Sequence, residues 1–129
     1  MIVLDSHIWF WWTLRHPKLS NDYIQIIQKN ESTGLIISAI SCWELALAHK
    51  KGKLLIPCSL DDWFKSALSY PGIVVQPLTT EIGRESVGLP EPFHRDPADR
   101  FIVATARVLK CPILTADEEI LSYPHVKHP

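Results

Sequence analysis

Ile2-Val3-Leu4-Asp5 is the stretch from which the fold can be worked out, because three apolar residues stand in a row and a carboxylate closes them. Short apolar runs of this kind indicate buried strands, and further runs occur at 34–38, 73–75 and 112–115. Longer segments with helical signals separate them. Strands that alternate with helices are typical of a parallel sheet covered by helices. The sequence therefore predicts an α/β sandwich around a central parallel sheet.

The helices between these strands are predicted from their caps and breakers. They run over about 6–14, 20–30, 40–51, 59–69, 79–87, 96–110 and 117–121. Ile40, Trp43 and Leu47 recur at helical spacing and predict a stripe that faces inward. Val126 is a candidate for an edge strand, and Trp63 is expected to pack in the core.

Composition limits the class of protein. The 129 residues are 47% apolar and 21% charged, which excludes intrinsic disorder and predicts one domain over residues 1–129. A formal net charge of -1 excludes a protein that grips nucleic acid with its whole surface. Three widely spaced cysteines fit neither a disulfide framework nor a zinc knuckle. No signal peptide or membrane span is evident, so we expect a cytoplasmic protein that is native from its first residue.

Acidic side chains follow the predicted strands. Asp5 ends the first strand, Glu44 lies one turn into the helix after the second, and Asp117 follows the fourth. Asp96 and Asp99 open the apolar helix before that fourth strand. Ligand sites of α/β folds lie outside the carboxyl ends of the strands, and carboxylates are preferred ligands of Mg²⁺ and Mn²⁺. The sequence therefore predicts a magnesium or manganese site at this edge.

Each of these carboxylates also has a purely structural interpretation. Capping-box spacing joins Ser41 to Glu44 and Thr115 to Glu118, and helix-start positions fit Asp96, Asp99 and Asp117. Two features favour a site over caps alone. Glu44 falls on the apolar stripe, and Asp5 ends a buried strand with no capping partner three residues on. A buried carboxylate needs a partner or a cation.

Four motifs together resemble a known family. In chain order they are Ile2-Val-Leu-Asp5, Ser38-Ala-Ile-Ser-Cys-Trp-Glu44-Leu-Ala46, Asp99-Arg-Phe-Ile-Val-Ala-Thr-Ala106 and Ile113-Leu-Thr-Ala-Asp117. The chain resembles a PIN domain, and specifically the bacterial VapC-type ribonucleases of toxin–antitoxin pairs. The resemblance extends from residue 1 to about residue 121, and the Asp5-Ser-His-Ile-Trp9 and His94-Arg-Asp-Pro-Ala-Asp-Arg100 segments resemble one subgroup.

The resemblance implies a three-layer α/β/α sandwich and metal-dependent cleavage of RNA. The matching catalytic and metal-binding acids are Asp5, Glu44, Asp99 and Asp117, with Asp96 as a further ligand or a helix cap and Ser6 and Thr115 as auxiliary hydroxyls. One or two Mg²⁺ or Mn²⁺ ions would lower the pKa of an attacking water and offset charge in the transition state. A small antitoxin protein and a homodimer or higher homo-oligomer are the implied partners.

Basic and aromatic residues have two interpretations each. Lys50, Lys51, Arg95 and Arg100 are candidates for RNA or antitoxin contacts, and the two lysines also suit a helix C-terminus. For Trp11 a partner or dimer contact is favoured over base stacking. His7 and His94 leave open a site with mixed histidine and aspartate ligands for Zn²⁺ or Mn²⁺.

The leading hypothesis is an endoribonuclease that serves as the toxin of a type II toxin–antitoxin pair. One alternative keeps the nuclease but makes it an RNA-processing enzyme without a toxin role. Another is a catalytically silent scaffold, although a scaffold has no physical use for buried carboxylates that repel one another.

Overall fold

The computed structural model describes residues 1–129 and contains a four-stranded parallel sheet with the order β3-β2-β1-β4. The strands are β1 (Ile2–Leu4), β2 (Leu35–Ser38), β3 (Ile73–Gln76) and β4 (Ile113–Leu114). β1 is one of the two inner strands, and its residue Val3 lies between Ile36 of β2 and Ile113 of β4. The predicted central parallel sheet is confirmed.

Seven helices connect and cover the strands. They are α1 (Ser6–Leu14), α2 (Asn21–Asn30), α3 (Ala39–Lys50), α4 (Leu60–Ala67), α5 (Thr80–Val87), α6 (Pro97–Leu109) and α7 (Glu118–Leu121). The helices α2, α4 and α5 begin at hydroxyl caps, because the side chains of Ser20, Ser59 and Thr79 each accept a hydrogen bond from the amide three residues on. No helix combines the length and hydropathy needed to cross a membrane.

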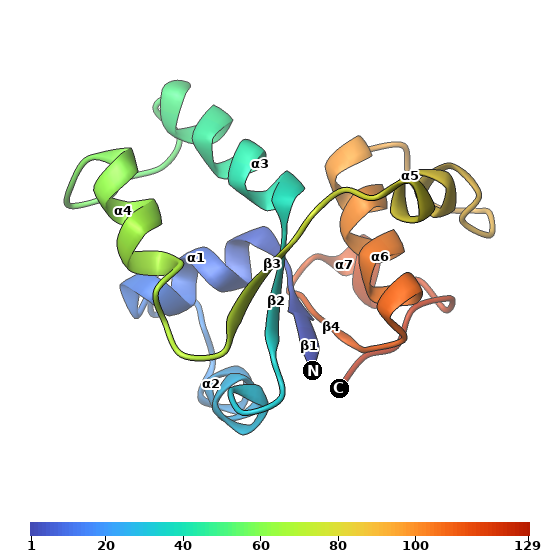
Figure 1. The fold of residues 1–129 in the computed structure, drawn as a ribbon, viewed down its shortest axis with the longest axis horizontal. Coiled ribbons are helices and arrows are strands. Elements are labelled where there is room, and N and C mark those ends of the chain that lie inside the picture. The colour runs from blue at the N-terminus through green and yellow to red at the C-terminus, as the bar shows by residue number, and fades with distance from the viewer.

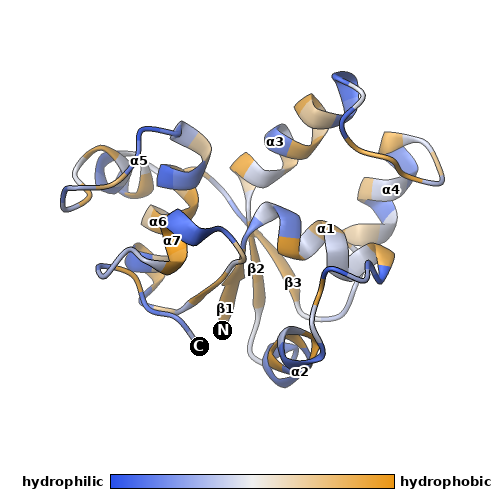
Figure 2. Ribbon diagram, turned by 180° about the vertical axis from the view of Figure 1, so that it is seen from behind, coloured by the Kyte–Doolittle hydropathy of each residue, from blue (hydrophilic) through white to orange (hydrophobic).

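Helices lie on both faces of the sheet, so the molecule has three layers (Figure 1). Side chains of β1 alternate between the layers: Ile2 and Leu4 belong to the cluster shared with α1, α2 and α4, whereas Val3 belongs to the cluster shared with α6 and α7. The two inner strands β1 and β2 are buried on both faces and carry apolar residues along most of their length (Figure 2). The predicted α/β/α sandwich is confirmed.

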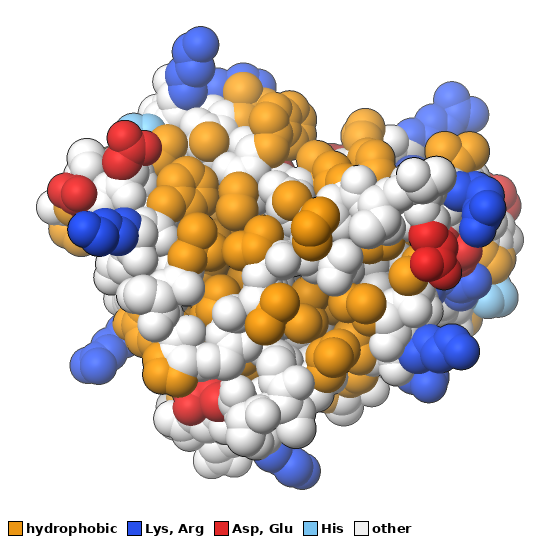
Figure 3. Space-filling view, in the orientation of Figure 1, with side chains coloured by type: hydrophobic (Ala, Val, Ile, Leu, Met, Phe, Trp, Pro, Cys, Tyr) orange, Lys and Arg blue, Asp and Glu red, His pale blue; other side chains and the backbone are white.

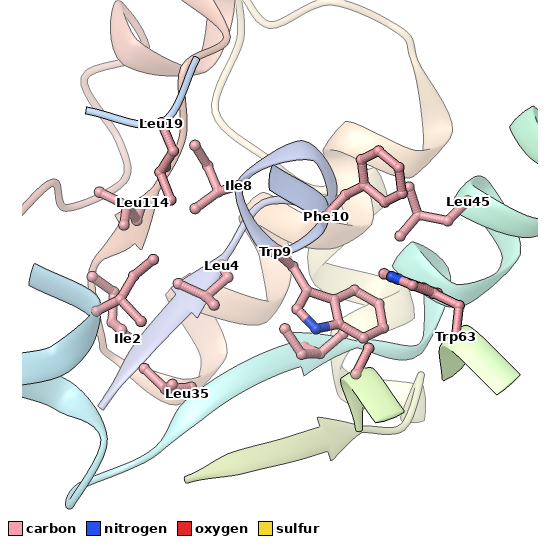
Figure 4. Close-up of a cluster of buried hydrophobic side chains, with 13 residues drawn as sticks. Ile2, Leu4, Ile8, Trp9, Phe10, Leu19, Leu35, Leu45, Trp63 and Leu114 are labelled. Carbon is pink, nitrogen blue, oxygen red and sulfur yellow. The ribbon is translucent and has the colours of Figure 1, made fainter. Parts of the chain in front are cut away.

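A dense aromatic cluster fixes α1 against the sheet (Figure 4). The ring of Trp9 is fully buried and lies 5.0 Å from the ring of Trp63, centroid to centroid. Trp63 in turn donates a hydrogen bond from Nε1 to Thr13 Oγ1, 3.3 Å away. The prediction that Trp63 is a packing residue is confirmed. Because α1 begins directly after Asp5, this packing also holds the start of the helix at the carboxyl edge of the sheet.

Two local predictions are wrong. Trp43 is 56% exposed, because α3 runs away from the sheet after β2 (Figure 1) and buries the side that carries Ser41 and Leu45 instead. Val126 is buried but belongs to no strand. The neighbouring Lys127 carbonyl accepts one hydrogen bond from the amide of Ile113, and one bond does not make a strand pair.

Candidate active site

All five acids singled out in the sequence line one pocket at the carboxyl ends of the strands. The pocket has a volume of about 480 Å³ and is lined by Asp5, His7, Trp11, Lys18, Glu44, Asp96, Asp99, Ala116 and Asp117. The acids come from the end of β1, the second turn of α3, the start of α6 and the segment after β4. The parallel sheet therefore brings together side chains that are up to 112 positions apart in the chain (5 to 117).

Asp5 is the most deeply buried of these acids, with 6% of its surface exposed. Its Oδ1 accepts a hydrogen bond from the amide of Ser6 at 2.8 Å, and its Oδ2 accepts one from Thr115 Oγ1 at 2.6 Å. Burial raises the pKa of Asp5, although both hydrogen bonds favour the charged form. The carboxylate is thus held in one orientation at the floor of the pocket.

Thr115 links Asp5 to the last acid of the chain. Its Oγ1 also accepts a hydrogen bond from the amide of Asp117 at 3.0 Å, and its carbonyl oxygen accepts one from the hydroxyl of Tyr23 at 2.7 Å. Asp117 itself caps α7, because its Oδ1 accepts from the amide of Glu119. The predicted capping box that starts at Thr115 is therefore wrong, and the Asp117 cap is confirmed.

Glu44 is positioned by two serines. Ser6 Oγ lies 2.6 Å from Glu44 Oε1 and 2.7 Å from Ser41 Oγ. A hydroxyl carries one proton, so if Ser6 donates to Glu44, Ser41 must donate to Ser6. Burial raises the pKa of Glu44, and the Ser6 hydrogen bond only partly offsets the shift. The predicted Ser41 capping box is wrong, because Ser38 caps α3 through the amide of Ile40.

Asp96 and Asp99 open α6. Asp96 is the cap, because its Oδ1 accepts from the amide of Asp99 at 3.2 Å, and Pro97 takes the first helical position. Asp99 is half-buried in the first turn. Burial, together with repulsion from each of the other four acids, raises the pKa of Asp99 to about 8. The pocket therefore favours a proton or a cation on Asp99.

His94 lies beside Asp99 at the rim of the pocket. Its Nε2 is 3.0 Å from Asp99 Oδ2, and its Nδ1 is 3.0 Å from Oε2 of Glu119, a side chain that is 62% exposed. His94 Nε2 is buried and has no hydrogen-bond partner with suitable angles. It therefore lies close to Asp99 Oδ2 without donating a hydrogen bond to it. Sequence reasoning missed Glu119, because its position depends on how the short helix α7 packs beside residue 94.

The donor set of the pocket fits a hard divalent cation. Carboxylate oxygens predominate, the hydroxyls of Ser6 and Thr115 orient two of them, and no cysteine lines the wall. No group of three or more of these side chains forms a ready-made coordination shell. Mg²⁺ suits such an arrangement, because it keeps several waters and binds through few protein carboxylates plus substrate phosphate.

The basic residues singled out in the sequence do not line this pocket. Lys50, Lys51 and Arg95 are exposed elsewhere, the two lysines at the end of α3. Arg100, with 14% of its side chain exposed, donates to backbone carbonyls that include Ser86 and pairs with Glu91. It holds the loop before α6 in place. The cation that does line the pocket is Lys18, beside Trp11, and the sequence pattern had not indicated it.

The sequence and the fold of this chain are similar to those of known proteins. A family model described as "PIN domain" matches residues 2–126. Ribonuclease VapC22 of Mycobacterium tuberculosis is 30% identical over 124 residues, which cover 96% of this chain and 92% of that protein.

Two solved structures share the fold. One is VapBC2 from Rickettsia felis bound to a promoter DNA fragment, with a TM-score of 0.74, 16% identity and coverage of 100% of this chain and 98% of that chain. The other is a toxin–antitoxin complex from Klebsiella pneumoniae, with a TM-score of 0.66, 19% identity and coverage of 98% and 95%. The family model, the relative and the fold agree: the chain belongs to the PIN domain family and to its VapC-type branch.

Proposed function

We propose that this chain is a Mg²⁺- or Mn²⁺-dependent endoribonuclease that hydrolyses RNA phosphodiester bonds as the toxin of a type II toxin–antitoxin pair. The observation that carries the proposal is the convergence of five carboxylates on one pocket, where crowding and burial raise the pKa of Asp99 to about 8. The similarity to ribonuclease VapC22 over 96% of the chain supports the choice of RNA as substrate.

Asp5, Glu44, Asp99 and Asp117 are the residues that would hold the ion. A bound divalent cation would lower the pKa of an attacking water and offset charge on the phosphoryl oxygens. We assign Asp96 the role of helix cap and not of metal ligand, because it is exposed and its Oδ1 already accepts a hydrogen bond from the amide of Asp99.

The hydroxyls around the acids act as positioning groups. Ser6 donates to Glu44 and Thr115 donates to Asp5, so neither hydroxyl is free to attack a phosphorus atom. Water is therefore the nucleophile that this site leaves available. The hydrogen bonds also hold the carboxylates in place before substrate arrives, which avoids reorganisation during the reaction.

The test is a cleavage assay on total tRNA and on a generic single-stranded RNA, with Mg²⁺, with Mn²⁺ and with EDTA. Asp5→Asn removes one charge from the floor of the pocket, and Asp22→Asn in the first turn of α2 is a matched control on the surface. We expect metal-dependent cleavage that Asp5→Asn abolishes and Asp22→Asn retains. Equal rates for the wild type and Asp5→Asn would refute the acid-cluster mechanism.

Calorimetry with Mn²⁺ separates the remaining outcomes. Metal binding without cleavage of either RNA would indicate a narrow substrate. Absence of both metal binding and cleavage would favour the scaffold alternative, in which the fold is kept only for binding.

This chain has an exposed apolar surface that a partner protein could bind. Figure 3 shows hydrophobic side chains across the face on which β3 lies, and the exposed apolar residues of this edge strand are Val74 and Val75. Trp43 on α3 is a further exposed aromatic. We assign an antitoxin to this chain because the solved structures that share its fold are a VapBC complex and a toxin–antitoxin complex.

The toxin role and the RNA-processing role differ in what expression does to a cell. A toxin expressed without its antitoxin arrests growth, and Asp5→Asn relieves the arrest. Normal growth in cells that contain the active nuclease would favour the processing role. Sedimentation of the purified chain decides between a monomer and the expected homodimer or higher homo-oligomer.

A further inference from the structure

The mouth of the acidic pocket holds one unpaired cation. Lys18 is the lysine or arginine that lines the pocket, and it faces a wall of five carboxylates. The ion pairs of the structure involve His94, Arg100 and Arg107, and the Lys18 ammonium forms neither an ion pair nor a hydrogen bond within the chain. Its three N–H donors are available to a ligand.

The backbone brings Lys18 to this position. Helix α1 starts at the pocket and ends at Leu14, after which Arg15 adopts the left-handed conformation (φ 51°) and reverses the chain. The amide of His16 then donates to the Trp11 carbonyl at 2.8 Å, and the amide of Lys18 donates to His16 Nδ1 at 3.1 Å. The next residue, Leu19, is buried in the core. The turn therefore has a defined conformation and carries Lys18 back over the helix.

Trp11 supports the lysine side chain. The Lys18 ammonium lies 5.8 Å from the centroid of the indole ring, within the range of a cation–π contact. The His16 ring stacks on the same indole with a centroid distance of 5.9 Å and an interplanar angle of 28°. An ammonium held over an aromatic ring is kept at the mouth of the pocket instead of folding onto the carboxylates.

RNA is a polyanion, and a pocket lined by carboxylates repels it unless cations offset the charge. We propose that Lys18, positioned by Trp11, binds a phosphate of the RNA strand next to the phosphate that is cleaved. This inference rests on the proposed ribonuclease function and names the residue that docks the substrate. Lysine suits the role because its compact ammonium contacts phosphate oxygens as a point charge.

The first test measures RNA binding without cleavage. Fluorescence anisotropy follows a short labelled single-stranded RNA in the Asp99→Asn background, across a range of salt concentrations. Lys18→Gln should weaken binding about 3- to 10-fold and reduce the slope of log K against log salt by about 0.7, the value for one phosphate contact on a single strand. Lys18→Arg should keep both values. Lys29→Gln, which removes an exposed charge from the end of α2, is the matched control.

The second test uses the active enzyme. Lys18→Gln should raise KM by a similar factor and leave kcat within about twofold, because the contact lies away from the reacting atoms. If Trp11 acts through Lys18, adding Trp11→Leu to Lys18→Gln should weaken binding no further. An affinity and salt slope equal to those of Lys29→Gln would overturn the inference, as would a Lys18→Gln defect confined to binding of a partner protein.

The two proposals fail in different ways. If Lys18→Gln still cleaves RNA with an unchanged KM, the proposed role of Lys18 is refuted and the proposed nuclease function is not. A wild-type protein that neither binds Mn²⁺ nor cuts RNA refutes the nuclease, and the anisotropy measurement still decides whether Lys18 binds RNA. Absence of RNA binding in every variant overturns both.

Discussion

The two ends of α6 carry opposite charges and are used differently. At its start, Asp96 and Asp99 face the acidic pocket. At its end, Arg107 lies in a second pocket of about 420 Å³, where its Nε is 2.7 Å from Glu85 Oε1. The helix dipole favours acids at the start and bases at the end, so the dipole alone accounts for both.

The neighbours of each end make the difference. Arg107 has an acidic partner and also donates to the carbonyl of His125, so its charge is compensated within the fold. Asp99 has His94 Nε2 3.0 Å away without an aligned hydrogen bond, and four further acids lie around it. Burial with this repulsion raises the pKa of Asp99 to about 8. Charge that the fold concentrates without compensating it marks a functional site more clearly than the presence of a pocket does.

The largest contrast should appear in activity. Asp99→Asn at the start of the helix should lower the rate of RNA cleavage by about 10²–10³-fold, the range for one electrostatic group of an active site. Glu85→Gln, which breaks the ion pair at the other end, should leave cleavage within about twofold and lower the free energy of unfolding by at most about 1 kcal/mol. Cleavage kinetics and chemical denaturation of both variants measure these effects. A similar loss of activity in both variants would remove the distinction between the two ends.

Metal affinity should respond to the hydroxyl that holds Asp5. Thr115→Val keeps the shape of a buried side chain but removes the hydrogen bonds to Asp5 and from Asp117, so Mn²⁺ binding should weaken about 10- to 100-fold. Thr105→Val is the control, because that buried hydroxyl donates only to the Phe101 carbonyl within α6. Calorimetry measures the Mn²⁺ affinity of both variants. Equal affinities for Thr115→Val and Thr105→Val would mean that Thr115 has no positioning role.

Stability of the metal-free protein should fall as pH rises. The pKa of Asp99 is about 8 in the folded chain, against the ordinary aspartate value of 3.8, so the folded state binds more protons than the unfolded state between these pH values. The free energy of unfolding should therefore decrease from about pH 4 to about pH 8, by about 1–3 kcal/mol after solvent screening. Chemical denaturation in EDTA at a series of pH values measures this decrease. Asp99→Asn should make the decrease smaller without abolishing it, because the pKa values of Asp5 and Glu44 are also raised. A profile that rises with pH in the wild type would contradict the raised pKa of Asp99.

The smallest effect concerns Asp96, where a cap and a metal ligand make different predictions. Asp96→Ala should lower the free energy of unfolding by about 1 kcal/mol, because the amide of Asp99 loses its acceptor. Asp96→Asn keeps the cap and removes the charge, so it should retain both stability and Mn²⁺ affinity. If Asp96→Asn lost Mn²⁺ as Asp99→Asn does, Asp96 would be a ligand and the assignment to the cap would be wrong.

Secondary structure and the acidic edge were accessible from the sequence because their signals are local. Apolar runs predict the strands, and caps such as Ser20 and Thr79 predict where helices begin. The buried side of α3 was not accessible in this way. The helical spacing of apolar residues predicts that Trp43 is buried, but it is exposed. The side that a helix buries depends on which elements pack against it, and spacing does not show this.

The order of strands and acids along the chain is enough to predict that Asp5, Glu44 and Asp117 meet, because parallel strands end at a common edge. How each acid is held depends on packing, since Ser6, Ser41 and Thr115 come from segments distant in the chain. Packing also determines which cations are unpaired: Arg100 is engaged by a loop, whereas the left-handed turn at Arg15 leaves Lys18 at the mouth of the pocket. Raised pKa values and unpaired charges arise from distances between segments, and local sequence patterns do not encode those distances.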